Sequence, residues 1–179
     1  MINYDLTFVK AIIFDVDGVL SLSTIQMSPA GLPVRTVNIK DGYAIQLAIK
    51  MGMKIAIISG GTDPSIEERY RKLGMTDIFM SCSTKIQVLN QYLADNHLSA
   101  DEVIYVGDDI PDYEIMKVVA VRAVLPMLAA TSRKSPPTSV LTRVARVVLA
   151  TSSSRYCVPR VCGCLQPKPS DGSESVHSS

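Results

Sequence analysis

Two carboxylates that lie two residues apart, Asp15 and Asp17, are the first residues in the chain whose types and spacing could do chemistry. They follow the apolar run Ala11–Phe14 and precede Gly18, which allows a sharp turn. Such a pair can supply a nucleophile and an acid/base, or can hold a divalent cation. The alternative is an ordinary turn, because Asp and Gly are common turn residues and Asp often caps helices.

Other polar groups favour the chemical interpretation. Ser59, Gly60 and Gly61 follow another apolar run and offer a hydroxyl and backbone amides suited to phosphate oxygens. Lys85 could supply a fixed cation, although a single lysine on a helix usually lies in solvent. An acidic cluster follows a third apolar run and consists of Asp108, Asp109 and Asp112.

The elements that must position these groups alternate along the chain. Short apolar runs predict buried parallel strands, and they are Ala11–Phe14, Lys54–Ile58 and Val103–Val106. The predicted helices between them are Tyr43–Met51, Pro64–Leu73 and Thr84–Asn96. This alternation predicts an α/β fold with a doubly wound, Rossmann-like parallel sheet. Such sheets bind ligands at the carboxyl ends of their strands, where the polar groups should therefore converge.

The segment from Leu20 to Asn38 has a different pattern. Its apolar residues are interrupted by Ser28–Gly31, a strong turn signal, which predicts a small β-hairpin flap. The spacings from Asp15 to Ser59 and from there to the acidic cluster leave no room for a cap domain. We therefore expect an open cleft in the monomer.

Length and composition exclude some classes of protein. The 179 residues suffice for one domain, and a net charge of +1 gives no general attraction to nucleic acid or to a membrane. The N-terminus lacks the pattern of a secretion signal, and no apolar run approaches the roughly 20 residues that cross a bilayer. We therefore expect a cytoplasmic protein with reduced cysteines.

The composition changes near Lys117. Residues 1–117 hold 10 Lys and Arg against 15 Asp and Glu, whereas residues 118–179 hold 8 against 2, so the sign of the net charge reverses. We divide the chain into a core at 1–117, an atypical segment at 118–168 and a Ser-rich tail at 169–179 that is expected to be disordered.

The motifs of the core resemble those of the haloacid-dehalogenase superfamily, in the order Asp15 with Asp17, Ser59, Lys85, and Asp108 with Asp109 and Asp112. The resemblance implies that Asp15 is a nucleophile and Asp17 an acid/base. It also implies a Mg²⁺ ion held by Asp15, the backbone carbonyl of Asp17 and Asp108. Lys85 would neutralise charge, while Asp109 and Asp112 would support the site.

A closer resemblance is to the capless phosphatases of 3-deoxy-D-manno-octulosonate 8-phosphate, over about residues 8–117. The residues that carry it are Phe14–Leu20, Asn38–Ile45, Ile57–Gly61 and Val106–Asp112. It implies hydrolysis of a phosphorylated 2-keto-3-deoxy sugar acid in lipopolysaccharide precursor synthesis, and a homotetramer. Lys40, Asp41 and Gly42 could form a substrate wall, or Asp41 could cap a helix.

Two alternatives to this function stay open. The substrate could be a nine-carbon sugar acid 9-phosphate, which these motifs do not distinguish from the eight-carbon one. The chain could also be an inactive remnant, because the family's last strand, final helix and tail are not recognisable after Lys117.

A shift of the reading frame would explain the atypical segment. If Val147–Cys157 is read from the third base of its first codon, suitable synonymous codons give Cys-Ala-Arg-Asp-Val-Ile-Glu-Gln-Val-Leu, a family-like amphipathic helix. The same shift can turn Pro126–Leu128 into Asp-Ala and Arg133–Ser135 into Glu-Val. We interpret residues from about 118 onward as a frameshifted translation.

Restoring the alternative frame should raise both stability and turnover. The given segment places Pro136 and Pro137 where a helix is expected, and each proline inside a helix costs about 3 kcal/mol. Thermal melting, tetramer content and turnover of this chain and of a frame-restored version would be compared. Equal values for the two proteins would show that the segment is a functional variant.

Overall fold

Five parallel strands form the central sheet of the protein, in the order β5-β4-β1-β6-β7. A computed structural model describes residues 6–119 and 121–124. The strands of the sheet are β1 (Ala11–Phe14), β4 (Lys54–Ile58), β5 (Asp77–Phe79), β6 (Val103–Gly107) and β7 (Val121–Val124). The α-helices are α1 (Ile39–Lys50), α2 (Pro64–Lys72), α3 (Lys85–Asp95) and α4 (Tyr113–Val118). Three short 3₁₀ turns are η1 (Leu6–Phe8), η2 (Ala100–Glu102) and η3 (Ile110–Asp112).

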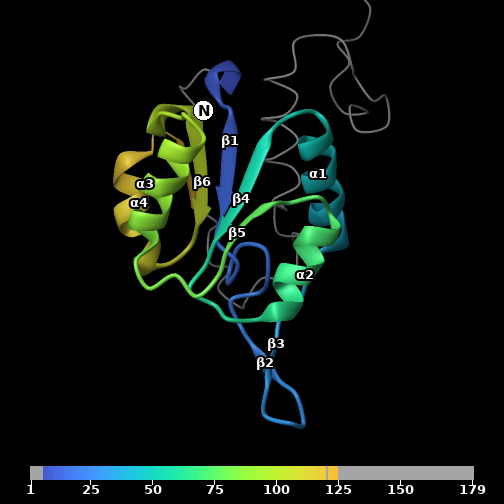
Figure 1. The fold of residues 1–179 in the computed structure, drawn as a ribbon. Helices are drawn as coiled ribbons and strands as arrows, with labels where there is room; N and C mark the ends of the chain where they lie inside the picture. The colour runs from blue at the N-terminus through green and yellow to red at the C-terminus, as the bar shows by residue number, and fades with distance from the viewer. Residues whose placement is uncertain (1–5, 120, 125–179) are drawn as a thin grey trace, which may run out of the picture.

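Helices cover both faces of this sheet, α1 and α2 on one side and α3 and α4 on the other (Figure 1). The strands β1 and β6 are apolar and buried because each face of the sheet packs against a helix layer. In β1, Ile12 and Phe14 join one buried cluster, and Ala11 and Ile13 join the other. This arrangement confirms the predicted α/β fold with a doubly wound parallel sheet, and no inserted cap domain lies among the described residues.

The middle strand β1 holds the sheet together. It pairs in parallel with β4 on one side and β6 on the other, so that Ile13 lies between Ala56 and Tyr105. All four of its residues are buried. The end of β1 is therefore fixed by pairing with a strand on each side and by packing on both faces of the sheet.

The helix α1 begins four residues earlier than predicted. Asn38 caps it, because its side chain accepts a hydrogen bond from Lys40 N. The alternative in which Asp41 is the cap is wrong, since Asp41 lies inside the first turn and is buried. Asp63 caps α2, because its side chain accepts a hydrogen bond from Ser65 N.

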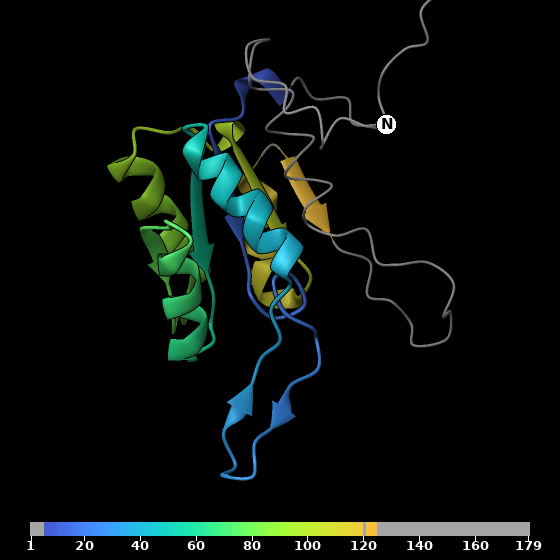
Figure 2. The same cartoon turned by 90° about the vertical axis from the view of Figure 1, so that its right-hand side faces the viewer.

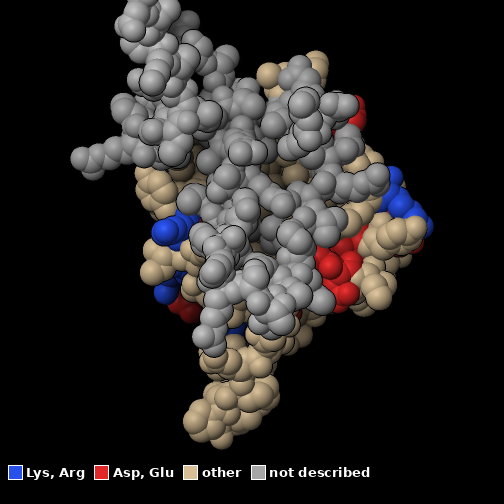
Figure 3. All heavy atoms as spheres, turned by 180° about the vertical axis from the view of Figure 1, so that it is seen from behind, with Lys and Arg blue, Asp and Glu red and all other residues tan. Residues whose placement is uncertain are grey.

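The predicted flap is a hairpin of two very short antiparallel strands, β2 (Gln26–Met27) and β3 (Pro33–Val34). It projects from the carboxyl end of the sheet, away from the helices (Figure 2). From behind, the projecting hairpin has no charge colour (Figure 3), and the sequence carries no Lys, Arg, Asp or Glu between Leu20 and Val34. Its large apolar side chains, Met27 and Leu32 among them, are exposed.

The sheet continues beyond the core boundary expected at residue 117. The strand β7 pairs with β6 in parallel, with Val121 opposite Ile104 and Val124 opposite Gly107, and it lies at one edge of the sheet (Figure 2). The expectation that the last strand is missing is therefore wrong, because an apolar run suffices to extend the sheet whatever its origin. The final helix and the tail lie outside the described residues, as does most of the segment from about residue 118 that is interpreted as frameshifted.

Helices of the described ranges are short or carry charges. None of them combines the length and the apolar character that crossing a bilayer requires.

Replacing Ile13 by Ala should lower the free energy of unfolding by about 2–5 kcal/mol, because the side chain is fully buried and its loss leaves a cavity beside β1. Urea denaturation measures the change. The control is Ile39→Ala, since Ile39 is 78% exposed and should change stability by no more than about 0.5 kcal/mol. Equal losses in the two variants would contradict the central place of β1 in the core.

Candidate active site

The carboxylate of Asp15 lies at the point where β1 leaves the sheet. Its backbone N–H still donates to Val106 O of β6 at 2.9 Å, so the residue keeps the geometry of the strand. Its Oδ1 accepts a hydrogen bond of 2.7 Å from Val16 N. Burial raises the pKa of Asp15, and the hydrogen bond and charge of Lys85 oppose that rise. The Asp15 carboxylate is therefore fixed in position, because each of its two oxygens has a partner.

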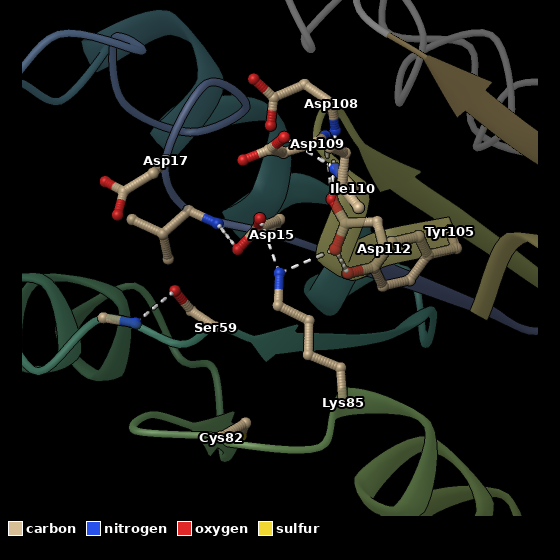
Figure 4. A network of polar contacts seen from close by, with 12 residues as sticks. Asp15, Asp17, Ser59, Cys82, Lys85, Tyr105, Asp108, Asp109, Ile110 and Asp112 are labelled. Atoms are coloured by element: carbon tan, nitrogen blue, oxygen red, sulfur yellow. Dashed lines mark hydrogen bonds and ion pairs between the residues drawn. The ribbon is translucent and has the colours of Figure 1, made fainter. Parts of the chain in front are cut away.

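The ammonium group of Lys85 joins two carboxylates (Figure 4). Its Nζ lies 2.7 Å from Asp15 Oδ2 and 2.7 Å from Asp112 Oδ1. Burial lowers the pKa of Lys85, but the hydrogen bonds to Asp112 and Asp15 outweigh it, so the pKa is raised overall. Lys85 begins α3 and is buried, so it is not the solvated helix lysine of the alternative interpretation.

Asp112 holds Lys85 in place and is itself fully buried. Its Oδ1 accepts hydrogen bonds from Lys85 and, at 2.6 Å, from the Tyr105 hydroxyl. Its Oδ2 accepts weaker ones from the backbone N–H groups of Asp108 and Asp109, at 3.2 and 3.4 Å. The lone pairs of this carboxylate are therefore largely used within the protein.

Asp108 has an unsatisfied acceptor. Its Oδ1 is shielded from solvent and has no hydrogen-bond partner among the described residues. Burial raises its pKa to about 6, and the charges of Asp15, Asp112 and Asp109 add to the effect. Gly18, at φ +77°, makes room for this carboxylate, because a Cβ at that position would collide with it. A shielded carboxylate oxygen without a donor is the feature expected where a cation belongs.

The residues present fit a divalent cation. Carboxylate oxygens of Asp15, Asp108 and Asp112 lie within 4.8 Å of one another. Hard cations such as Mg²⁺ take oxygen ligands of this kind. Because Asp112 already binds Lys85 and Tyr105, Asp15 and Asp108 are the better candidates for ligands. The part assigned to the backbone carbonyl of Asp17 stays a prediction.

Ser59 follows β4, the neighbour of β1, and is buried. Its Oγ accepts a hydrogen bond of 3.1 Å from Gly61 N, which leaves the hydroxyl hydrogen free to donate. Together with Gly60 it faces the same cleft as the carboxylates. The group could therefore hold an anionic oxygen beside Asp15.

A cleft of about 670 Å³ brings these residues together at the carboxyl end of the sheet. This volume is in the range of small-molecule sites. Of the predicted site residues, the cleft is lined by Asp15, Asp17, Ser59, Gly60, Gly61, Lys85, Asp108 and Asp109. Asp112 lies behind Lys85 rather than in the wall.

The predicted substrate wall lies elsewhere. Lys40, Asp41 and Gly42 belong to the first turn of α1 and are not among the residues that line this cleft. Gly42 has a packing reason for its identity, because a Cβ there would lie 3.1 Å from the Arg69 side chain and 3.2 Å from that of Leu73. Their contact with a substrate stays a prediction.

Arg35 is the main site residue that sequence reasoning missed. It lines the cleft, and its Nε and Nη2 donate to the two oxygens of Asp17 at 2.6 and 2.9 Å. Tyr105 was also missed, because a tyrosine inside an apolar strand is normally interpreted as a residue of the hydrophobic core. No motif indicated either residue. The partner of Arg35, Asp17, is 18 residues away in the sequence, and Tyr105 meets Asp112 only in the fold.

Comparison with known proteins gives one consistent result. Over 111 residues the chain is 34% identical to the 3-deoxy-D-manno-octulosonate 8-phosphate phosphatase KdsC of Escherichia coli (strain K12), which covers 62% of this chain and 59% of that protein. The match thus spans less than two thirds of the relative's length. No protein-family profile matches the chain.

Solved structures share the fold. The 3-deoxy-D-manno-octulosonate 8-phosphate phosphatase of Yersinia pestis superposes with a TM-score of 0.70 at 27% identity, over 82% of this chain and 84% of that one. The Moraxella catarrhalis enzyme, crystallised with a magnesium ion, a phosphate ion and a KDO molecule, gives 0.67 at 20% identity over 82% and 89%, a likeness of fold alone.

The order of the motifs, the uncapped parallel sheet and the sequence match over the core agree with one another. Over about residues 8–117, the chain is therefore similar to the capless 3-deoxy-D-manno-octulosonate 8-phosphate phosphatases of the haloacid-dehalogenase superfamily.

Proposed function

We propose that the chain is a Mg²⁺-dependent phosphatase that hydrolyses 3-deoxy-D-manno-octulosonate 8-phosphate through an aspartyl-phosphate intermediate. The observation that carries the proposal is the position of Asp15. Its carboxylate leaves the central strand, lies 2.7 Å from Lys85 Nζ and faces a cleft beside the partnerless Asp108 Oδ1. An immobilised nucleophile, a fixed cation and an anion-holding hydroxyl are the groups that phosphoryl transfer needs.

In the first half-reaction, a carboxylate oxygen of Asp15 attacks phosphorus and the bond from phosphorus to the sugar oxygen breaks. Asp17 donates a proton to the departing alkoxide, which leaves as an alcohol. Lys85 and the hydroxyl of Ser59 hold the oxygens of the phosphoryl group while it moves. Because Lys85 is anchored by Asp112, it need not reorganise during the step.

In the second half-reaction, water attacks the phosphorus of the aspartyl phosphate. Asp17 accepts a proton from this water, and the bond from phosphorus to the Asp15 oxygen breaks. Phosphate leaves and the Asp15 carboxylate is restored. Two easier displacements thus replace one very slow hydrolysis.

Asp15 and Asp108 would hold the cation, with the Asp17 carbonyl as a further ligand. When bound, Mg²⁺ screens the repulsion between the Asp15 carboxylate and a phosphate dianion. The support in this chain is the excess of negative charge, since Asp15, Asp108 and Asp112 share one buried lysine. The partnerless Asp108 Oδ1 would gain a partner by this binding.

The substrate is proposed from the relatives. Their shared name specifies an eight-carbon keto-deoxy sugar acid phosphate, and the Asn38–Ile45 string is the most family-specific part of the resemblance. The cleft of about 670 Å³ has room for a sugar acid of this size. A nine-carbon acid with a 9-phosphate is the competing substrate.

We also propose a homotetramer in the cytoplasm, as in the family. The support is the flap, which exposes Met27, Leu32 and Val34 on a projection without charged residues. Exposed apolar surface of this kind is typical of sites that bind another protein surface. Packing of flaps against one another would also cover the open side of each cleft.

Asp15→Asn should reduce phosphatase activity to below about one per cent of the parent, because the amide keeps the size but cannot form the intermediate. Turnover is measured with and without Mg²⁺, and removal of the ion should abolish activity of the parent. The matched control is Asp95→Asn, which changes an exposed carboxylate on α3 and should leave turnover unchanged. Substantial activity in the Asp15 variant would exclude the covalent mechanism.

Among phosphorylated sugars, 2-keto-3-deoxy acids of eight or nine carbons should have the highest kcat/KM. The physical reason is that a site built to pair polar groups of its substrate rejects analogues that leave those groups unpaired. The measurement compares the eight-carbon 8-phosphate, the nine-carbon 9-phosphate and glucose 6-phosphate under equal conditions. Equal or better kinetics with glucose 6-phosphate would reject the proposed substrate class.

A further inference from the structure

Arg35 is the charged residue of the flap segment that lines the cleft, together with Ser23. It follows β3, where its neighbours Val34 and Val37 are 46% and 41% exposed, yet only 7% of its own side chain is exposed. Burying a guanidinium requires partners, and the partners of Arg35 are the carboxylates of Asp17 and Asp63.

The contact with Asp17 is the stronger of the two. Two N–H groups of Arg35 donate to the two oxygens of Asp17 at 2.6 and 2.9 Å, whereas the nearest Asp63 oxygen lies 3.5 Å from Nη1. A two-point contact between a guanidinium and a carboxylate fixes the plane of the carboxylate as well as its distance. The Ser21 hydroxyl donates a third, longer hydrogen bond of 3.2 Å to Asp17.

Without Arg35, Asp17 would be poorly fixed. Its side chain is 38% exposed and lies in the turn after β1, beyond the part that the sheet holds. Gly61 keeps the space for the guanidinium, because a Cβ at that position would lie 3.2 Å from Arg35 Nη2. Asp63, which caps α2, holds the far side of the guanidinium. Three separate segments thus converge on the pair.

We propose that Arg35 is a positioning residue that fixes the orientation of the Asp17 side chain, so that it is aimed to accept the proton of the attacking water. This inference rests on the proposed function. Both oxygens of Asp17 accept hydrogen bonds from Arg35. This two-point contact fixes the direction from which Asp17 meets the attacking water in the second half-reaction.

Water and the aspartyl phosphate are the only reactants in the step that depends on Arg35. A water oxygen forms a bond to phosphorus, and the bond from phosphorus to the Asp15 oxygen breaks. The proton of the water passes to Asp17, and the electron pair of the broken bond returns to the Asp15 carboxylate. Arg35 neither gains nor loses a proton, and it acts only by orienting the side chain of Asp17.

The test uses p-nitrophenyl phosphate, whose leaving group departs without a proton from Asp17. In Arg35→Met, the first burst of p-nitrophenol should keep its rate, because Asp15 and Lys85 are untouched. The steady rate that follows should fall about 10–100-fold, part of the 10²–10⁴ that a general base contributes. The burst amplitude should then approach one per active site. Arg35→Lys keeps the charge but loses the two-point contact, so its steady rate should lie between those of the parent and of Arg35→Met.

A double variant separates positioning from a general loss of structure. Arg35→Met should have no further effect in an Asp17→Asn background, because a residue that acts through Asp17 has nothing left to position. Arg71→Met is the matched control: this arginine is half exposed and pairs with Glu67 on α2, so both phases should stay unchanged.

The outcomes are distinguishable. A burst rate that falls with the steady rate, or additive losses in the double variant, would mean that Arg35 has a structural role only and would overturn the inference. An unchanged steady rate in Arg35→Met would overturn it as well. Absence of any turnover in the parent chain would instead overturn the proposed function, and this inference with it.

Discussion

A buried lysine between two buried carboxylates is the interaction on which the rest of this site depends. Taking the charge of Lys85 out of water is unfavourable unless its partners are well placed. Its Nζ meets Asp15 and Asp112 at 2.7 Å each. The three residues come from the end of β1, the start of α3 and the turn before α4. The order of strands in the sheet must therefore be correct before this charge can be buried at all.

The same interaction explains why a cation belongs next to it. One lysine compensates part of the charge of Asp15 and Asp112, and Asp108 is left beside them with a shielded oxygen that no described donor reaches. Burial, together with the charges of the neighbouring carboxylates, raises the pKa of Asp108 to about 6. A bound cation removes this repulsion, so the fold carries an electrostatic cost that binding of the ion relieves.

Much of the fold could be predicted because the strands are so apolar. The strands Ala11–Phe14 and Lys54–Ile58 have the bounds that the sequence indicates, since each continuous run ends abruptly at a polar residue. The strand β5 was missed because it has three residues of intermediate burial and no such run. The strand β7 was missed because the change of composition near Lys117 pointed to a break there.

Prediction of the site had a similar limit. The convergence of Asp15, Ser59 and Lys85 follows from strand ends, which always meet at one edge of a parallel sheet. Tyr105 could not be found this way, because its hydroxyl gains a role only when the turn after β6 brings Asp112 back over the strand. Side chains that act through a tertiary partner leave no local pattern in the sequence.

Arg35 shows how a flap can be tied to chemistry without a cap domain. The hairpin has only four residues in strands and an exposed apolar surface, so few interactions within the hairpin itself stabilise its position. Its base is held by the guanidinium, which binds Asp17 after β1 and Asp63 before α2. Whatever displaces the hairpin must therefore strain this ion pair. The orientation of the Asp17 carboxylate is consequently linked to that of the flap, because Arg35 contacts both Asp17 and the start of α2.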